Sequence, residues 1–204
     1  MSFERTGQPD WDWWGNLFPD PQRLLRDVGV GDGTRVADVC CGDGYFTLAA
    51  AEQVGDEPVY ATDIDPEMLG RLERLAAERG LTTVEPIEGD ARNLPELLPE
   101  NVDVVLLANV LHGVPEPAAL ADAVRDVLAS DGRFVVINWH DLPREETTVP
   151  RGDDDAPEPR GPPTELRLSS EQAEAVVDEA GFDLKSLADV PPYEYHYVSV
   201  FEEG

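Results

Sequence analysis

The chain has 204 residues, enough for one domain with a sizeable core, and its formal net charge is −28. Such an excess of acids, with a single lysine at Lys185, argues against non-specific binding of nucleic acid, which needs cationic side chains against phosphates. No basic N-terminal region precedes an apolar stretch and no apolar run reaches membrane-spanning length, so we expect a cytoplasmic protein without a membrane partner.

The acidic residues are spread along the whole chain rather than gathered in one tail. A uniformly solvated acidic surface explains this pattern better than a docking face for a basic partner. Uniform acid with almost no lysine is typical of adaptation to molar intracellular salt, where a Debye length of about 3 Å weakens self-repulsion. We therefore expect a halophilic protein.

Residues 1–18 are rich in aromatic side chains, namely Trp11, Trp13, Trp14 and Phe18. We expect this stretch to be irregular, and to form either an apolar flap over the edge of the core or a lid over a pocket. Asp20 and Pro21 then predict the start of a helix, because aspartate caps and proline suits the first turn. Gly29 ends this helix.

Residues 35–47 predict a strand, a tight glycine turn and the start of a helix that continues to residue 54. Gly42 and Gly44 let the backbone turn sharply and approach a ligand without a Cβ in the way. A ligand over this turn would meet free backbone N–H groups and the positive end of the helix dipole.

The same stretch bears on the identity of the ligand. The dinucleotide pattern G-x-G-x-x-G needs a third glycine, and Thr47 stands at that position. Asp38, at the end of the strand, would repel a pyrophosphate but welcome a cation. Both residues argue against a dinucleotide.

Two further strands end on polar turns. Residues 58–63 predict a second strand that ends on Asp63, and Asp65 caps the next helix, which Gly80 ends. An acid at this position, about 20 residues past the glycine turn, is where α/β nucleotide sites hold a ribose. Residues 84–88 predict a third strand, which the turn Gly89-Asp90-Ala91 follows.

The second half of the chain continues the alternation. Residues 102–108 predict an apolar strand of the kind covered on both faces, and residues 133–140 a fifth strand. Residues 141–166, rich in proline and containing the run 153–155 of three aspartates, predict a lid or a disordered loop. A capping box at Ser169 opens a helix. The final strands are predicted over residues 182–190 and 195–201.

The segment Asp38-x-Cys-Cys-Gly-Asp-Gly resembles motif I of the class I S-adenosylmethionine-dependent methyltransferases, in their small-molecule, type 11-like branch. Cys40 stands where that family usually has glycine. The resemblance covers roughly residues 20–203. It implies a doubly wound α/β fold, a mostly parallel seven-stranded Rossmann-like sheet with helices on both faces and an antiparallel last strand. We expect residues 1–204 to form a single methyltransferase domain.

The resemblance implies S-adenosylmethionine as the cofactor. In that family the acid matching Asp38 lies near the methionine amino group, and the glycines matching Gly42 and Gly44 pass under the cofactor. Asp63 matches the ribose-binding acid, and Asp90 would accept a hydrogen bond from the exocyclic amine of adenine. Further contacts to the cofactor are expected from Cys40, Ile64, Ala91 and Asn109.

Methyl transfer mainly requires that donor and acceptor are positioned and water is excluded, and a base is needed only when the nucleophile carries a proton. His140 is our first candidate base, because its strand end faces the methyl-donating side and the long loop follows it. His112 is the second, and His196 is expected on the strand surface. We expect Trp13 and Trp14, with residues 141–166, to close over these strand ends.

A small-molecule acceptor remains by elimination. The Asn-Pro-Pro-Tyr-type motif of DNA amino-methyltransferases, the additional cysteines of arsenite methyltransferases and an appended RNA-binding module are all missing from the sequence. We expect no nucleic-acid partner and no metal, and the oligomeric state stays open. Two alternatives remain: a non-catalytic S-adenosylmethionine-binding or scaffolding domain, and an NAD-linked oxidoreductase, against which Thr47 and Asp38 argue.

Overall fold

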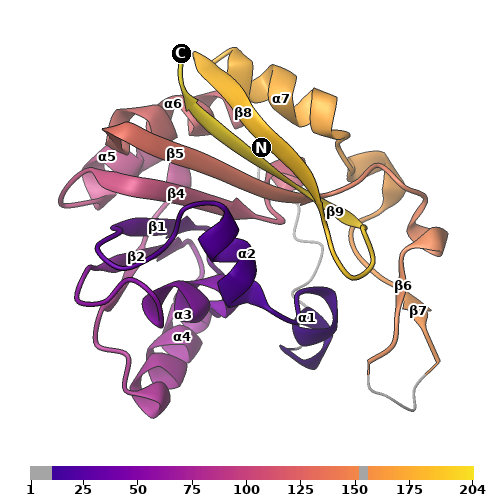
Figure 1. The fold of residues 1–204 in the computed structure, drawn as a ribbon, viewed down its shortest axis with the longest axis horizontal. Helices are drawn as coiled ribbons and strands as arrows, with labels where there is room; N and C mark the ends of the chain where they lie inside the picture. Colours follow the sequence, from indigo (N-terminus) through magenta and orange to yellow (C-terminus); the bar gives the residue numbers. More distant parts are fainter. Residues whose placement is uncertain (1–10, 152–155) are drawn as a thin grey trace.

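A seven-stranded sheet with the order β3-β2-β1-β4-β5-β9-β8 forms the centre of the protein (Figure 1). The computed structural model describes residues 11–151 and 156–204. Strands β1 to β5 run parallel, and β9 pairs antiparallel with both β5 and β8. The strands are β1 (Val36–Val39), β2 (Val59–Asp63), β3 (Val84–Glu88), β4 (Val102–Ala108), β5 (Leu128–Trp139), β8 (Phe182–Val190) and β9 (His196–Glu203). The predicted doubly wound, mostly parallel fold is confirmed.

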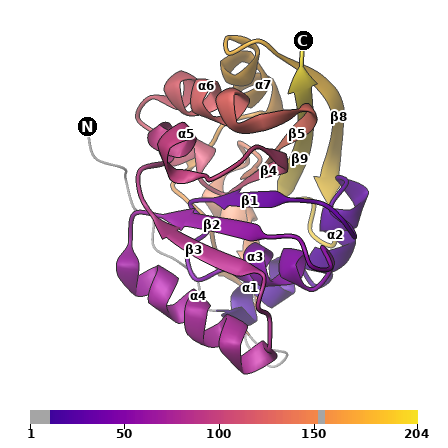
Figure 2. The same ribbon diagram turned by 90° about the vertical axis from the view of Figure 1, so that its left-hand side faces the viewer.

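Helices cover both faces of the sheet, as Figures 1 and 2 show. One apolar cluster joins the sheet to α5, α6 and α7, and two others join the opposite face to the first four helices. The helices are α1 (Trp11–Leu17), α2 (Pro21–Asp27), α3 (Tyr45–Ala51), α4 (Pro66–Arg79), α5 (Leu94–Leu97), α6 (Pro117–Val127) and α7 (Ser170–Asp178). Among the described residues, no helix combines the length and the apolar character that crossing a bilayer requires.

The predicted helix starts are confirmed by their capping hydrogen bonds. The side chain of Asp20 accepts from the backbone N–H of Arg23, and that of Asp65 accepts from the backbone N–H of Glu67. At α7 both bonds of the capping box between Ser169 and Gln172 are present. Each bond satisfies a backbone donor that a helix end leaves free, so local sequence fixes these boundaries.

Three predicted features are wrong. Residues 11–17 form α1 rather than an irregular stretch, because Trp13, 5% exposed, anchors one side of this helix in the core. Strand β5 begins at residue 128 rather than 133, because Leu128 already pairs with Val102 of β4. Strand β4 is not wholly apolar: Asp103 points to the surface and accepts hydrogen bonds from the backbone and guanidinium of Arg35.

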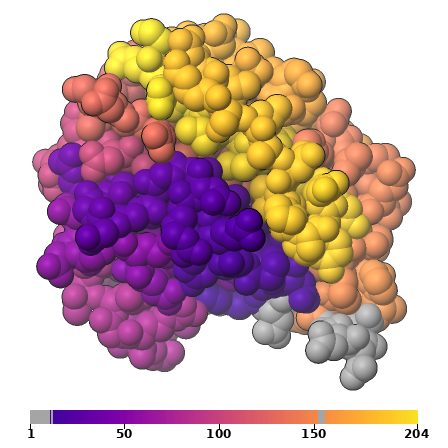
Figure 3. All heavy atoms as spheres, viewed as in Figure 1, coloured from indigo at the N-terminus to yellow at the C-terminus, as the bar shows by residue number. Residues whose placement is uncertain are grey.

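Residues 141–166 are largely ordered around a small second sheet. Strands β6 (Thr148–Val149) and β7 (Glu158–Pro159) pair antiparallel beside α1 (Figure 1). The predicted aspartate run at 153–155 lies outside the described residues. In the space-filling view, the N-terminal helices lie against the hairpin of β8 and β9 (Figure 3).

Candidate cofactor and acceptor site

The turn after β1 has the backbone conformation that a glycine-rich loop needs. Gly42 and Gly44 have φ of 57° and 87°, and Cys40 adopts a φ of 57° although it carries a side chain. Cys40 thus takes the left-handed conformation that a glycine would adopt freely, at a cost in strain. At Gly44, which caps α3, a Cβ would overlap Cδ1 of Leu72, so only glycine fits.

Asp63, at the end of β2, is held in place by two backbone N–H groups. Its Oδ2 accepts from Gly42 at 2.8 Å and its Oδ1 accepts from Asp65 at 2.9 Å. Each carboxylate oxygen can still accept a further hydrogen bond, which suits the two hydroxyls of a ribose. The neighbouring Ile64 is 49% exposed, and its apolar surface lies free beside this carboxylate.

Asp38, at the end of β1, is sealed from water. It is 2% exposed, and its Oδ2 accepts from the hydroxyl of Thr47 at 2.5 Å. Burial, with the nearby charge of Asp63 adding to it, raises the pKa of Asp38 to about 7, although the Thr47 hydrogen bonds oppose the shift. Thr47, which broke the dinucleotide pattern, is therefore the residue that satisfies this carboxyl group. A cation from a ligand would stabilise its charged form.

Asp90, after β3, is already engaged by an arginine. Arg92 donates to it from the backbone at 3.0 Å and from Nη2 at 2.6 Å, and bridges to Glu116 at the start of α6. These hydrogen bonds lower the pKa of Asp90. Ala91 beside it is buried and begins a short 3-10 helix. The contact from Asp90 to adenine stays a prediction, with Arg92 as a competing donor.

Asn109, directly after β4, carries an unsatisfied amide. Its backbone adopts a φ of 60°, which a non-glycine residue rarely does, and its N–H donates to the carbonyl of Ile137 at 2.7 Å. Its side-chain Oδ1 and Nδ2 are both buried, and neither has a hydrogen-bond partner within residues 11–151 and 156–204. Leaving such groups unpaired costs about 1–3 kcal/mol each, so this amide indicates a ligand at the end of β4.

The three histidines occupy different environments. His112 Nδ1 lies 3.0 Å from Oδ1 of Asn138, and His140 Nε2 lies 2.9 Å from Asp189 of β8. The expectation of a surface position for His196 is wrong, since this ring is 2% exposed between Phe18 and Trp139. Burial lowers the pKa of His196 far below its usual value. It is a core residue.

Trp139, at the end of β5, joins the two segments predicted to form a lid. It stacks on Trp13 of α1 at 6.0 Å, and the guanidinium of Arg167 lies 4.9 Å from its ring. Arg167 is buried and donates to the carbonyls of Leu142, Pro162 and Arg160 and to the hydroxyl of Thr147. Arg167 therefore organises residues 141–166, and nothing in its sequence neighbourhood signalled this role.

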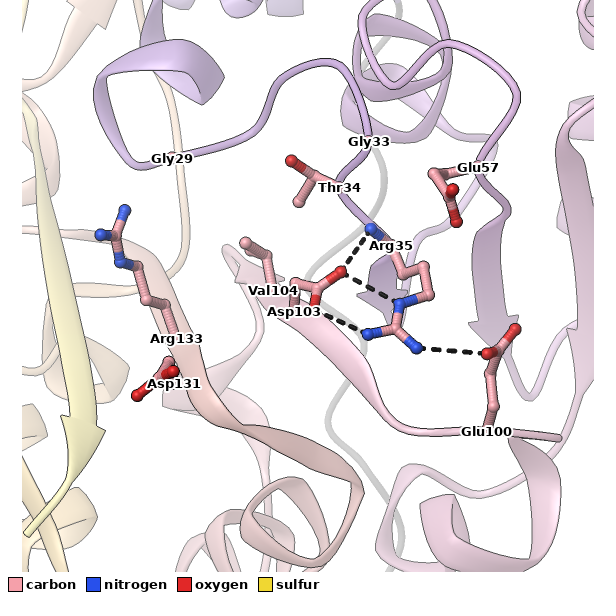
Figure 4. A pocket seen from close by; sticks show the side chains of 10 residues that line it. All are labelled: Gly29, Gly33, Thr34, Arg35, Glu57, Glu100, Asp103, Val104, Asp131 and Arg133. Carbon is pink, nitrogen blue, oxygen red and sulfur yellow. Dashed lines mark hydrogen bonds and ion pairs between the residues drawn. The ribbon is translucent and has the colours of Figure 1, made fainter.

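A separate groove of about 600 Å³ lies at the amino ends of β1, β4 and β5, away from all the predicted site residues (Figure 4). Its central side chain is Arg35, which pairs with Asp103 at 2.9 Å and with Glu100 at 3.3 Å.

Acids at the ends of neighbouring parallel strands, above a glycine turn that opens a helix, define an α/β protein that binds a nucleoside-containing ligand. Comparison with known proteins shows which domains this part of the chain resembles. Residues 36–132 match the family model described as a methyltransferase domain. Over this part the chain is similar to methyltransferase domains, and its fold is shared with solved S-adenosylmethionine-dependent methyltransferases.

Individual relatives share this part of the chain. A tRNA (guanine(6)-N2)-methyltransferase of Thermus thermophilus is 42% identical over 102 residues, which are 49% of this chain and 30% of that protein. A demethylmenaquinone methyltransferase of Geobacillus stearothermophilus is 39% identical over 95 residues, 46% of this chain and 40% of that protein. The chain spans less than half the length of the curated relatives it matches.

The fold extends further than the sequence similarity. The crystal structure of a SAM-dependent methyltransferase from Aquifex aeolicus superposes with a TM-score of 0.78 at 22% identity, covering 94% of this chain and 93% of that one. At this identity the superposition confirms the predicted Rossmann-like fold.

Proposed function

We propose that the protein transfers a methyl group from S-adenosylmethionine to a small-molecule acceptor at the carboxyl ends of β1, β2 and β4. The observation that carries this proposal is the buried amide of Asn109 at the end of β4, which has no hydrogen-bond partner among the described residues. The cofactor, when bound, supplies an electrophilic methyl group on a sulfonium. The chain contributes groups that bind the cofactor and the acceptor, orient them toward each other and exclude water from them.

The residues at the strand ends fit this cofactor. Asp63 is oriented to accept from ribose hydroxyls, and Asp38 would pair with the amino group of the methionine. Ile64 offers exposed apolar surface for the adenine, with Asp90 and Ala91 at its edge. Gly42, Gly44 and Cys40 line the turn below, and Asn109 closes the site from β4.

A lid supports water exclusion. Residues 141–166 contact α1 through Asn16, whose amide donates to the carbonyl of Pro150 at 3.0 Å. Trp139 packs against Trp13 of α1 and lies close against Gly161. Because Trp139 ends β5, the lid formed by α1 and residues 141–166 lies next to the ends of β4 and β5. We propose that it opens to admit the acceptor and closes before transfer.

The acceptor is proposed to be a small molecule. The net charge of −28 and the single lysine oppose the phosphates of an RNA, although one relative is named for tRNA. The demethylmenaquinone methyltransferases are named for a small-molecule acceptor. His140 stays a candidate base. Since Asp189 holds its Nε2, His140 would have to use its other ring nitrogen.

The domain organisation and the cellular setting are proposed together with this activity. Residues 1–204 are proposed to act as one domain, which is supported by the apolar clusters on both faces of the common sheet. A cytoplasm at high salt is the proposed setting, supported by the acidic composition.

The test has two steps. Isothermal calorimetry measures S-adenosylmethionine binding, and release of S-adenosylhomocysteine is then measured with a panel of phenols, quinols, amines and unmodified tRNA. Asp63→Ala should weaken cofactor binding about tenfold or more, because it removes charge-assisted hydrogen bonds. Asp65→Asn, two residues along the same loop, is the control and should keep the affinity. Binding without turnover of any acceptor would favour the non-catalytic alternative, and turnover of tRNA alone would overturn the small-molecule proposal.

A further inference from the structure

We propose that Asn138 and Tyr197 hold His112 with its proton on Nδ1, so that Nε2 takes a proton from the nucleophile of the acceptor. Asn138 is then a positioning residue, and the acceptor is an oxygen or nitrogen nucleophile that carries a proton. This inference rests on the proposed methyl transfer and specifies its chemistry.

The hydrogen bonds of Asn138 fix the tautomer. Asn138 is 0% exposed in β5, and its Oδ1 lies 3.0 Å from Nδ1 of His112. An amide oxygen can only accept, so Nδ1 must carry the proton, and in the neutral ring Nε2 is left with a free lone pair.

Tyr197 takes the other end of the Asn138 amide. The Nδ2 group of Asn138 donates to the hydroxyl of Tyr197 at 3.4 Å, while Oδ1 faces the histidine. Tyr197 is itself buried in the core on β9. The chain of three side chains therefore runs from the core to the end of β4.

The surroundings keep the ring neutral at physiological pH. Burial lowers the pKa of His112 below its usual value, Asn138 opposes this, and the charge of Arg167 lowers it further. The other titratable groups around it are His140, His196 and Tyr197; charges on His112 and His140 both disfavour a proton on His196. Within the part of the chain that the structure describes, no carboxylate hydrogen-bonds the His112 ring to stabilise an imidazolium.

His112 is also the histidine in the right place. It lies in the 3-10 helix Leu111–Gly113 that follows β4, three residues after the unpartnered amide of Asn109. Its Nε2 has no hydrogen-bond partner among residues 11–151 and 156–204, and it is not one of the fully buried unpaired atoms. The Nε2 atom of His140, by contrast, is hydrogen-bonded to Asp189 on the edge strand β8, and His196 is enclosed in the core.

The proposed step balances without another reactant. The O–H or N–H bond of the acceptor breaks and its proton passes to Nε2 of His112. The electron pair of the acceptor forms the new bond to the methyl carbon, and the pair of the broken carbon–sulfur bond stays on sulfur. The imidazolium that results loses its proton to water before the next turnover.

The first test is the titration of the histidine rings by nitrogen NMR, which needs no acceptor. The variant without His112 identifies its signals. The wild-type ring should carry its proton on Nδ1 and titrate below pH 6.5. Asn138→Asp places a carboxylate against Nδ1 and should raise the pKa of His112 by about one unit or more. Asn101→Asp, an acid introduced far from this site, is the control and should leave the titration unchanged.

The second test is the pH dependence of kcat/KM with an acceptor found in the panel. The acid limb of the Asn138→Asp profile should move up with the pKa of His112, while S-adenosylmethionine affinity stays the same. Asn138→Leu should lower kcat about tenfold or more, because the tautomer is no longer fixed. A wild-type ring protonated on Nε2, or an acid limb that Asn138→Asp does not move, would overturn the inference. Failure of the proposed function would show differently, as absence of turnover with every acceptor.

Discussion

Binding of S-adenosylmethionine should release a proton from Asp38. In the free protein, burial raises the pKa of this carboxyl to about 7. An ammonium group placed beside it would stabilise the carboxylate and return the pKa toward 4 or below. At pH 6 the complex would then release about 0.9 of a proton, and at pH 7 about 0.5.

The affinity should follow the same linkage. Between pH 5.5 and 7.5 the association constant should rise about twentyfold, because a decreasing share of the binding energy is used to deprotonate Asp38. This window stays below the titration of the amino group of the ligand, near pH 7.7–8.0. The contribution of Asp38 to the folding stability of the free protein changes with pH in the opposite direction. A raised acid pKa favours the folded free protein at pH values below the unfolded pKa, and this contribution is lost as pH rises through 7.

Calorimetry in buffers of different ionisation enthalpy measures both quantities. Asp38→Asn should remove the proton release and flatten the pH dependence, with affinity at pH 7.5 reduced about tenfold or more. Asp43→Asn is the matched control, because Asp43 lies in the same turn and burial also raises its pKa. If the wild-type affinity is flat across this window, or if Asp43→Asn abolishes the effect instead, the role assigned to Asp38 is refuted.

Three other measurements follow from the structure. Arg167→Met should lower the free energy of unfolding by about 3 kcal/mol and expose residues 141–166 to protease, because it leaves buried oxygens unpaired. Arg23→Met on the surface is the control. Equal effects of the two substitutions would contradict the organising role of Arg167. Because we assign the base to His112, His140→Ala should leave the maximal rate nearly unchanged across pH 6–9, and a loss of about 10²-fold would instead make His140 the base. The thermal midpoint should rise toward molar potassium chloride, because screening weakens self-repulsion; a flat or falling midpoint contradicts the halophilic expectation.

Local rules predicted the framework of the fold well. Strand β4 was predicted from its apolar run, and the start of α4 from Asp65 and Pro66, because each signal acts within a few residues. Helix α1 was missed because its three tryptophans do not mark one stripe. It is held by contacts to distant residues, such as the stacking of Trp13 on Trp139. Such contacts cannot be read from local sequence.

The candidate site also contains residues that the sequence predicted and residues that it did not. Asp38, Asp63 and Asp90 were predicted as site residues because strand ends in an open α/β sheet meet at one edge. The partners that set their chemistry were not found. Thr47 counted only as a failed glycine, although it donates to Asp38 from α3, and Asn138 was noticed only as part of a strand end. Their roles depend on where neighbouring strands and helices place two side chains, which spacing along the chain does not specify.

The two edges of the sheet differ in what a ligand could gain. At the amino edge the groove is open, but Arg35 already shares its hydrogen bonds with Asp103 and Glu100, and this pairing lowers the pKa of Asp103. A ligand entering there would have to replace ion pairs that are already satisfied, for little net gain. At the carboxyl edge the side-chain amide of Asn109 lacks hydrogen-bond partners in the described part of the chain, and burial opposes the charge of Asp38. Both penalties disappear when a ligand supplies the missing groups, so we expect binding at the carboxyl edge rather than in the groove around Arg35.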